Sequence, residues 1–135
     1  MIKAVIDTNV LVSAFWTKNR LSPTVRIAEA ITGDLFTPLY SPEMIAEYRD
    51  VLSRSKFGFS PSEVRALIDH IVAHGWLVEP VDSDEQFPDP DDKVFFCTAL
   101  AAADDAPLLV TGIAKHYPPV HFIVSPAEFC DLLGI

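Results

Sequence analysis

The stretch "VIDTNVLVSAF", residues 5 to 15, decides the fold prediction because it places two polar residues inside an apolar run. Asp7 and Asn9 have apolar neighbours on both sides, and a carboxylate buried there costs free energy unless something compensates for it. A strand that ends at Ile6 explains the pattern. Asp7 is then the first residue beyond the strand, where its side chain faces a pocket while its neighbours are buried. Asn9 is expected to cap or orient Asp7.

Helices are predicted further along the chain by a Ser-Pro pair that recurs four times before amphipathic stretches. Serine is a favoured N-cap, and proline fits the first helical position. The four pairs begin at Ser22, Ser41, Ser60 and Ser125. A glutamate shortly after the pair strengthens the helix-start signal in three of them. Gly33 and Gly75 follow two of these helices as expected C-caps.

Short runs rich in β-branched residues lie between these helices and predict strands. They are "IKAVI" (2–6), "LFTPL" (35–39), "WLVEPV" (76–81), "PLLVT" (107–111) and "HFIVS" (121–125). The alternation of strands and helices predicts an α/β fold, a three-layer α/β/α sandwich with a mainly parallel central sheet. Ligands of such sheets bind outside the carboxyl ends of the strands, where Asp7 and Thr111 are expected.

Composition limits the number of domains, the kind of surface and the state of the cysteines that can be expected. Half of the 135 residues are apolar, which predicts one domain over residues 1–135 with a sizeable core. The net charge of −9 argues against a broad basic surface for nucleic acid. Cys97 and Cys130 lie in apolar segments without metal-ligand spacing, so we expect reduced core thiols. With no leader peptide and no membrane-spanning run recognised, a cytoplasmic protein without a membrane partner is expected.

Two further acidic residues stand where a carboxylate is informative. Asp92 ends the acidic run "DSDEQFPDPDD" (82–92), which predicts a solvated loop, and opens the apolar helix "KVFFCTALAAA" (93–103). It is either an ordinary N-cap or a functional anion at the positive end of that helix. Glu47 lies about 40° from Val51 around its helix, at the edge of the apolar face. It is either a solvated flank or a functional group.

Asp7, Glu47 and Asp92 come from separate elements that could meet at one point. Unpaired carboxylates that close would repel one another and take up protons. Mg²⁺ or Mn²⁺ would remove the repulsion, because both ions choose oxygen ligands and suit phosphate substrates. No Cys or His cluster points to zinc, and no Gly-rich phosphate loop is present. The four histidines are scattered and are expected to be ordinary surface or core residues: His70, His74, His116 and His121.

Four segments, in this order, resemble the PIN domain family, in particular its branch of toxin components of toxin–antitoxin systems. They are "VIDTNVLVSAF" (5–15), "SPEMIAEYRDVLSRSKF" (41–57), "DPDDKVFFCTALAAADDAPLLVTG" (89–112) and "HFIVSPAEFCDLL" (121–133). The resemblance implies a metal-dependent ribonuclease that hydrolyses single-stranded or structured RNA. It also implies a compact α/β/α fold, an antitoxin protein as a possible partner, and usually a homodimer.

The resemblance also implies roles for individual residues. Asp7, Glu47 and Asp92 match the catalytic ligands of Mg²⁺ or Mn²⁺, with Asn9 and Thr111 in supporting positions. Asp89 and Asp91 would be neighbours of this site rather than ligands. The bound ion would neutralise the scissile phosphate and lower the pKa of a water for in-line attack.

Ile113 departs from the family pattern. Members commonly have an aspartate, and in this branch often an asparagine, directly after the Thr-Gly of "VTG" (110–112). Isoleucine can neither coordinate a metal nor hold a water, so it counts against a second metal or an oriented nucleophilic water, while the remaining three acids can still bind one cation. Ile113 therefore predicts attenuated activity.

Contacts to the RNA backbone require basic residues near the site. The foremost candidates are Arg49, Lys115 and His116; further ones are Lys18, Arg20, Arg26, Arg54 and Lys56. For each of them, solubilising surface charge is the alternative interpretation.

Two other functions are compatible with the sequence. A strand that ends in Asp also begins the active site of haloacid dehalogenase-type phosphatases, although these need a second Asp where this chain has Asn9. A non-catalytic module that keeps the fold to bind RNA or an antitoxin is the other alternative, and Ile113 favours it. Metal-binding and nuclease assays would separate the three hypotheses.

Overall fold

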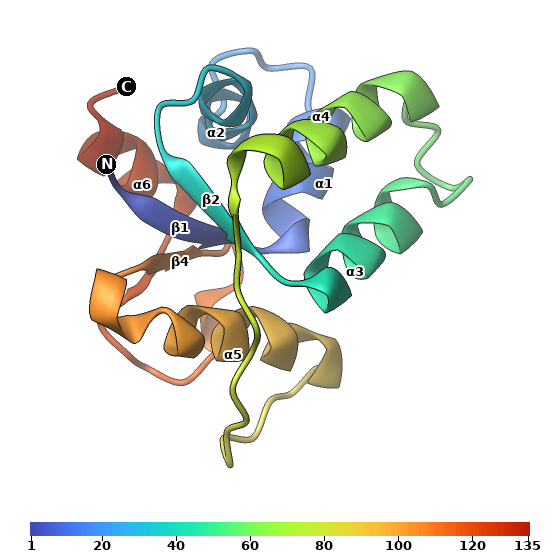
Figure 1. Ribbon diagram of the computed structural model, residues 1–135. Coiled ribbons are helices and arrows are strands. Elements are labelled where there is room, and N and C mark those ends of the chain that lie inside the picture. The colour runs from blue at the N-terminus through green and yellow to red at the C-terminus, as the bar shows by residue number, and fades with distance from the viewer.

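Five short parallel strands form the centre of the computed structural model, which describes residues 1–135 (Figure 1). They are β1 (Lys3–Ile6), β2 (Thr37–Tyr40), β3 (Trp76–Leu77), β4 (Leu108–Val110) and β5 (Ile123–Val124). Their order across the sheet is β3-β2-β1-β4-β5. The prediction of a mainly parallel sheet is confirmed, with strands shorter than the sequence runs that indicated them.

Helices cover both faces of the sheet, as the α/β/α prediction requires. They are α1 (Thr8–Trp16), α2 (Pro23–Thr32), α3 (Pro42–Leu52), α4 (Pro61–His74), α5 (Lys93–Ala101) and α6 (Pro126–Leu133). Figure 1 shows α5 on one side of the sheet, where it packs against β1, β2 and β4. On the other side α2 packs against α1, α4 and α6, while α3 lies against α1 and α4.

All four Ser-Pro pairs begin helices, so the predicted helix starts are confirmed. The hydroxyl groups of Ser41, Ser60 and Ser125 each accept a hydrogen bond from a backbone N–H of the first turn. Gly33 and Gly75 are C-caps, as expected. Gly75 has no room for a side chain, since a Cβ atom there would lie 2.6 Å from two backbone carbonyl oxygens.

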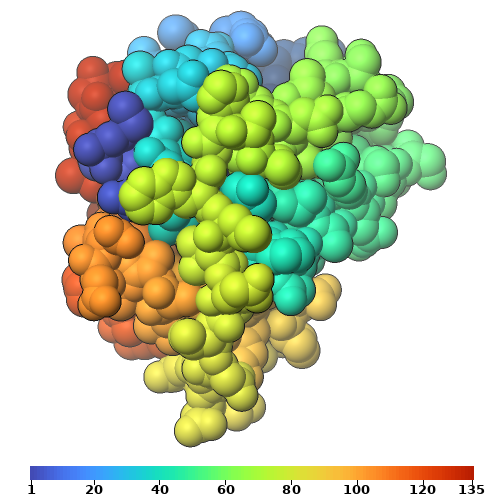
Figure 2. Space-filling view, viewed as in Figure 1, coloured from blue at the N-terminus to red at the C-terminus, as the bar shows by residue number.

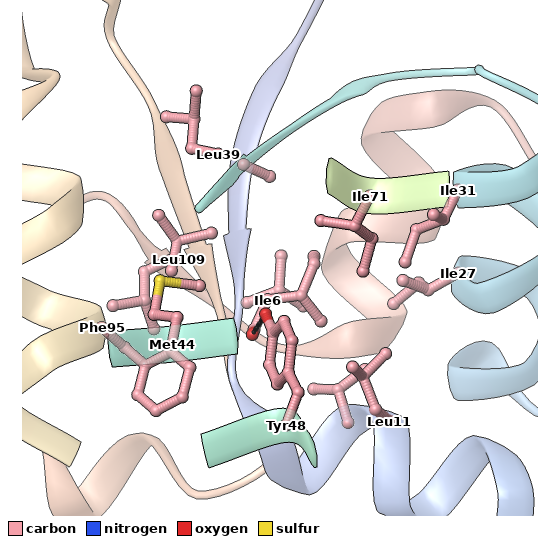
Figure 3. Packing of buried hydrophobic residues seen from close by; sticks show 14 of the residues in the cluster. Ile6, Leu11, Ile27, Ile31, Leu39, Met44, Tyr48, Ile71, Phe95 and Leu109 are labelled. Atoms are coloured by element: carbon pink, nitrogen blue, oxygen red, sulfur yellow. Dashed lines mark hydrogen bonds between the residues drawn. The ribbon is translucent and has the colours of Figure 1, made fainter. Parts of the chain in front are cut away.

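Buried side chains from helices on both sides of the sheet pack together at the end of β1. Tyr48 of α3 is almost fully buried and donates a hydrogen bond from its hydroxyl to the carbonyl of Ile6, the last residue of β1 (Figure 3). Its ring centroid lies 6.2 Å from that of Phe95 in α5. Because Tyr48 is fixed by this packing, its neighbour Glu47 is fixed relative to the end of β1 as well.

The order of the strands reverses between β1 and β4. The chain first builds outward from β1 through β2 to β3, and then returns to place β4 on the other side of β1. The backbone N–H of Asp7 donates to the carbonyl of Val110 over 3.0 Å, which sets Asp7 beside Thr111. The carboxyl ends of the strands at such a reversal are the usual ligand site of open α/β sheets.

The segment between β3 and α5 carries the acidic run. Figure 2 shows it in yellow-green and yellow, crossing this face of the molecule from α4 toward the start of α5. Most of residues 82–91 are exposed, so the predicted solvated loop is confirmed. Cys97 and Cys130 are buried free thiols, also as predicted. None of the helices combines the length and the apolar character needed to span a membrane.

Candidate functional site

Asp7 is a buried carboxylate between β1 and α1, only 3% exposed. Its Oδ2 atom accepts hydrogen bonds from Thr111 (2.9 Å), Tyr117 (2.8 Å) and Asn9 (3.0 Å). Burial raises the pKa of Asp7 above its usual value, while hydrogen bonds from the Tyr117 and Thr111 hydroxyls and from the backbone N–H groups of Asn9 and Thr8 act to lower it. No side-chain donor contacts the second oxygen, Oδ1. The side chain is therefore fixed in orientation.

Asn9 and Thr111 join the loops that follow β1 and β4. The Asn9 side-chain amide also donates to Thr111 Oγ1 over 3.2 Å, and its oxygen accepts the backbone N–H of Gly112 at 3.0 Å. Thr111 Oγ1 further accepts the backbone N–H of Ile113 at 3.1 Å. The structure thus brings both predicted supporting residues against Asp7, where they determine its orientation.

Glu47 lies on α3 and approaches the start of α1, next to Asp7. It is partly buried, and its Oε2 atom accepts a hydrogen bond from the hydroxyl of Thr8 over 2.7 Å. Burial raises the pKa of Glu47, the Thr8 hydrogen bond lowers it, and the charges of Asp91, Asp7 and Asp89 raise it further. Glu47 is thus not a solvated flank but one member of a group of interacting carboxylates.

Asp92 approaches Asp7 and Glu47 from the start of α5. It occupies the N-cap position as predicted, but its side chain makes no capping hydrogen bond, because Asp92 already has helical backbone angles at the end of the 3₁₀ turn Pro90–Asp92. Instead its Oδ2 atom lies 3.5 Å from Nδ1 of His116. Burial, followed by the charges of Asp7 and Asp89, raises the pKa of Asp92 to about 6, and His116 opposes this shift.

Asp7, Glu47 and Asp92 repel one another without forming a closed ligand set. Asp7 raises the pKa of both Glu47 and Asp92, and Glu47 raises the pKa of Asp92, so the charges of the three groups interact. Their oxygen atoms do not all come within 4.8 Å of one another, as is reasonable for anions with no cation between them. Carboxylate oxygens are the ligands that Mg²⁺ and Mn²⁺ choose, and wide spacing leaves room for the waters that Mg²⁺ retains. The donor set therefore fits a hydrated divalent ion.

Two residues of this network were missed in the sequence. Thr8 binds Glu47, and its signal was present: it is a third polar residue in the apolar run that contains Asp7 and Asn9. Tyr117 is 6% exposed and donates to Asp7, with its ring edge-on to Phe87 at 5.9 Å. Nothing in its spacing marked it, since the loop after β4 has no regular period.

The basic candidates divide into two groups. His116 contacts Asp92, and its exposed neighbour Lys115 lies on the same short 3₁₀ turn, Ala114–His116. Arg49 belongs to α3, two residues from Glu47, but pairs with Asp69 of α4 at 3.6 Å. The structure therefore brings His116 to the carboxylates and directs Arg49 away from them.

Comparison with known proteins gives one match. A family model described as PIN domain matches residues 3–112. No curated protein and no solved structure matches the chain. The matched range contains Asp7, Glu47, Asp92 and Thr111, and it ends one residue before Ile113.

Proposed function

The chain belongs to the PIN domain family, which generally comprises metal-dependent nucleases, and from that premise we propose that it is a Mg²⁺- or Mn²⁺-dependent endoribonuclease. The observation that carries the proposal is the meeting of Asp7, Glu47 and Asp92 at the strand-order reversal, with each pKa raised above its usual value. Groups perturbed in this way by burial and by one another are typical of functional sites. The match leaves the phosphatase alternative without support.

The three carboxylates are the groups that would hold the metal. Asp7 would contribute Oδ1, the oxygen that no side-chain donor contacts, and Glu47 and Asp92 would contribute from α3 and α5. A bound divalent ion supplies neutralising charge at the scissile phosphate and a water of lowered pKa for in-line attack. Its charge would also keep the three carboxylates ionised near neutral pH.

The remaining polar residues position these ligands. Thr111, Tyr117 and Asn9 hold Asp7 in one orientation, and Thr8 does the same for Glu47. Such partners are needed because a carboxylate with free rotation would lose entropy on binding a metal. His116 lies beside Asp92 and Lys115 precedes it on the same turn, and we expect both to contact the phosphates of the substrate.

A second group of residues favours single-stranded RNA as the substrate. Trp16 is 61% exposed and lies against Phe57 and Phe59, whose rings stack with centroids 5.0 Å apart. Lys56 sits over the Phe57 ring at 5.1 Å, and Lys18 lines the same hollow. Aromatic rings beside cations are typical of surfaces that bind unpaired bases and the phosphate backbone. Arg49 stays a candidate because its exposed pair with Asp69 is weak enough for a phosphate to replace.

The biological role that we propose follows the branch that the sequence resembles. The protein would be the toxin component of a toxin–antitoxin pair, a single domain over residues 1–135 that acts as a homodimer in the cytoplasm. Its partners would be RNA and an antitoxin protein. Isoleucine at position 113 supports a second candidate function, a non-catalytic module that binds RNA or an antitoxin.

A cleavage assay tests the proposal. Purified protein and its Asp7→Asn variant would be incubated with end-labelled single-stranded RNA, double-stranded RNA and single-stranded DNA, with Mn²⁺ or with a chelator. We expect Mn²⁺-dependent cuts in single-stranded RNA by the wild type alone. RNA binding without cleavage would favour the binding module, and cleavage that persists in the chelator would refute the metal-dependent mechanism.

A further inference from the structure

We propose that Asp34, His70 and His74 form a second metal site, which takes a borderline transition-metal ion such as Zn²⁺. Asp34 lies in the turn before β2, and the two histidines lie in the last turns of α4, which leads into β3. They are therefore at the amino ends of the strands, whereas Asp7 and Thr111 follow β1 and β4 at the carboxyl ends. The site is separate from the carboxylates of the proposed nuclease centre and does not depend on that function.

The three side chains already converge. His70 and His74 are four residues apart on one helix, so they share a face, and their rings stack with centroids 4.2 Å apart and an interplanar angle of 25°. Nε2 of His70 lies 2.8 Å from Oδ1 of Asp34. One ligand atom from each of the three residues falls within 4.8 Å of the others, and no further set of three or more such side chains in the chain does so.

A tetrahedral zinc ion requires only small movements from this starting point. With ligand bonds of 2.0–2.2 Å, the ligand atoms around zinc lie about 3.4 Å apart. Asp34 and His74 are exposed, so their side chains can rotate without disturbing the core. The existing His70–Asp34 hydrogen bond would be exchanged for two bonds to the ion, and a fourth position stays open to water.

The backbone that carries these ligands is fixed. Asp34 has a φ of +56°, in the left-handed region, and its N–H donates to the carbonyl of Ile31 over 3.1 Å. On the other side, the Tyr40 hydroxyl donates to the carbonyl of Val72, between the two histidines, over 3.1 Å. The backbone of the turn after α2 and of the end of α4 is thus held in place before an ion binds. This limits the entropy cost of binding.

The chemistry of this site differs from that of the carboxylate cluster. Two imidazoles and one carboxylate suit Zn²⁺, Co²⁺ or Ni²⁺, whereas Mg²⁺ prefers oxygen ligands alone. Three protein ligands with an open fourth position leave the ion accessible at the surface. The site could not be found in the sequence, because Asp34 and His70 are 36 residues apart. His70 and His74, expected to be ordinary surface or core residues, stack on each other, and His70 contacts Asp34.

Calorimetric titration of the metal-free chain with Zn²⁺, in excess Mg²⁺ to occupy the carboxylates, tests the proposal. We expect one Zn²⁺ per chain, and at least about tenfold weaker binding in His74→Gln and in Asp34→Asn, by comparison with the 10–100-fold effects of removing even indirect metal contacts. Asparagine tolerates the left-handed backbone of position 34, so that variant should stay folded. Melting curves without metal would verify the folding of each variant.

His121→Gln and Asp92→Asn are the matched controls, and both should bind Zn²⁺ like the wild type. Co²⁺ offers a second readout, since its visible absorption changes when imidazole replaces water as a ligand. A wild-type chain that takes up no Zn²⁺ would overturn the proposal. So would Zn²⁺ binding that survives in folded His74→Gln but is lost in Asp92→Asn, because the ion would then belong to the carboxylates.

Discussion

The Thr8 hydroxyl donates a 2.7 Å hydrogen bond to Glu47 and so ties the first turn of α1 to the middle of α3. The preceding residue, Asp7, accepts hydrogen bonds from Asn9 in the first turn of α1 and from Thr111 and Tyr117 after β4. Two consecutive residues therefore determine the positions of two of the three acids. Asp7 is itself one of these acids, and Thr8 holds the second one, Glu47, by a hydrogen bond. The turn between β1 and α1 is the organising element of the candidate site.

Thr8→Val tests this support directly, because valine keeps the branched shape and removes only the hydroxyl. We expect weaker Mn²⁺ binding and a loss of about 1.5–3 kcal/mol in the free energy of unfolding, the usual value of a hydrogen bond to a charged group. Urea denaturation and Mn²⁺ titration measure the two effects. Thr32→Val is the control, since its hydroxyl bonds only to the exposed carbonyl of Glu29. Unchanged Mn²⁺ affinity in Thr8→Val would argue against a supporting role.

Mn²⁺ or Mg²⁺ should stabilise the fold through the same acids. An ion that binds only the native state adds about 2.7 kcal/mol at a hundredfold excess over its dissociation constant. Thermal melting with Mn²⁺ or with a chelator measures the gain, and Asp7→Asn should abolish it. A melting temperature that does not respond to saturating Mn²⁺ would show that the three carboxylates hold no ion.

Asp92→Asn should separate stability from catalysis. The pKa of Asp92 in the fold is about 6, whereas an unperturbed Asp titrates at 3.8, so the folded state binds this proton more tightly than the unfolded state. The stabilisation from this proton is complete below about pH 4 and is lost as the pH rises through about 6. Asparagine carries no charge, so without metal the variant should be more stable than the wild type at pH 7, by about 1 kcal/mol after allowance for screening by water.

Denaturation of both proteins at pH 4, 5, 6 and 7 in a chelator measures this difference, which should vanish toward pH 4. Cleavage of RNA by Asp92→Asn should be abolished despite its higher stability, because the amide gives no charge to a cation. An Asn variant that cleaves like the wild type would exclude Asp92 as a ligand. Loss of stability at pH 7 would instead indicate a structural role for its charge.

Tyr117→Phe removes one of the three donors to Asp7 and keeps the ring that packs on Phe87. We expect a loss of about 1–2 kcal/mol in the free energy of unfolding, together with a slower metal-dependent cleavage rate, because Asp7 is then oriented by two side chains instead of three. Tyr40→Phe removes a hydroxyl that bonds to Val72 and should leave the cleavage rate unchanged. Equal rates in Tyr117→Phe and the wild type would limit Tyr117 to a role in folding.

Local patterns predicted the fold well because the relevant interactions are local. Ser41 and Ser125 cap their helices through bonds that span three residues, and the first strand ends where its apolar run meets Asp7. Parallel pairing then follows from the alternation of strands and helices. The convergence of Glu47 on the site was less evident, since an edge position on a helix is also what a solvated residue would occupy.

Contacts made by irregular segments could not be predicted in the same way. The approach of His116 and Tyr117 depends on the path of residues 112–120, which has no period to follow. Asp92 was a reasonable capping residue by position, but the 3₁₀ turn before it already satisfies the helix start. In both cases the decisive information lies in the tertiary packing of loops.

Ile113→Asp should raise the metal-dependent cleavage rate if the departure at this position limits activity. Ile113 is half-buried, and its backbone N–H bonds to Thr111 Oγ1, which in turn bonds to Asp7. A carboxylate introduced there could hold a second cation or a water, and each 1.36 kcal/mol recovered in the transition state gives about a tenfold faster rate. Ile113→Val is the control for shape, and melting curves would show whether the new charge is tolerated. If folded Ile113→Asp binds Mn²⁺ and RNA yet cleaves no faster than the wild type, the missing acid does not limit the rate. If neither protein cleaves, the non-catalytic binding module becomes the better account of this PIN domain.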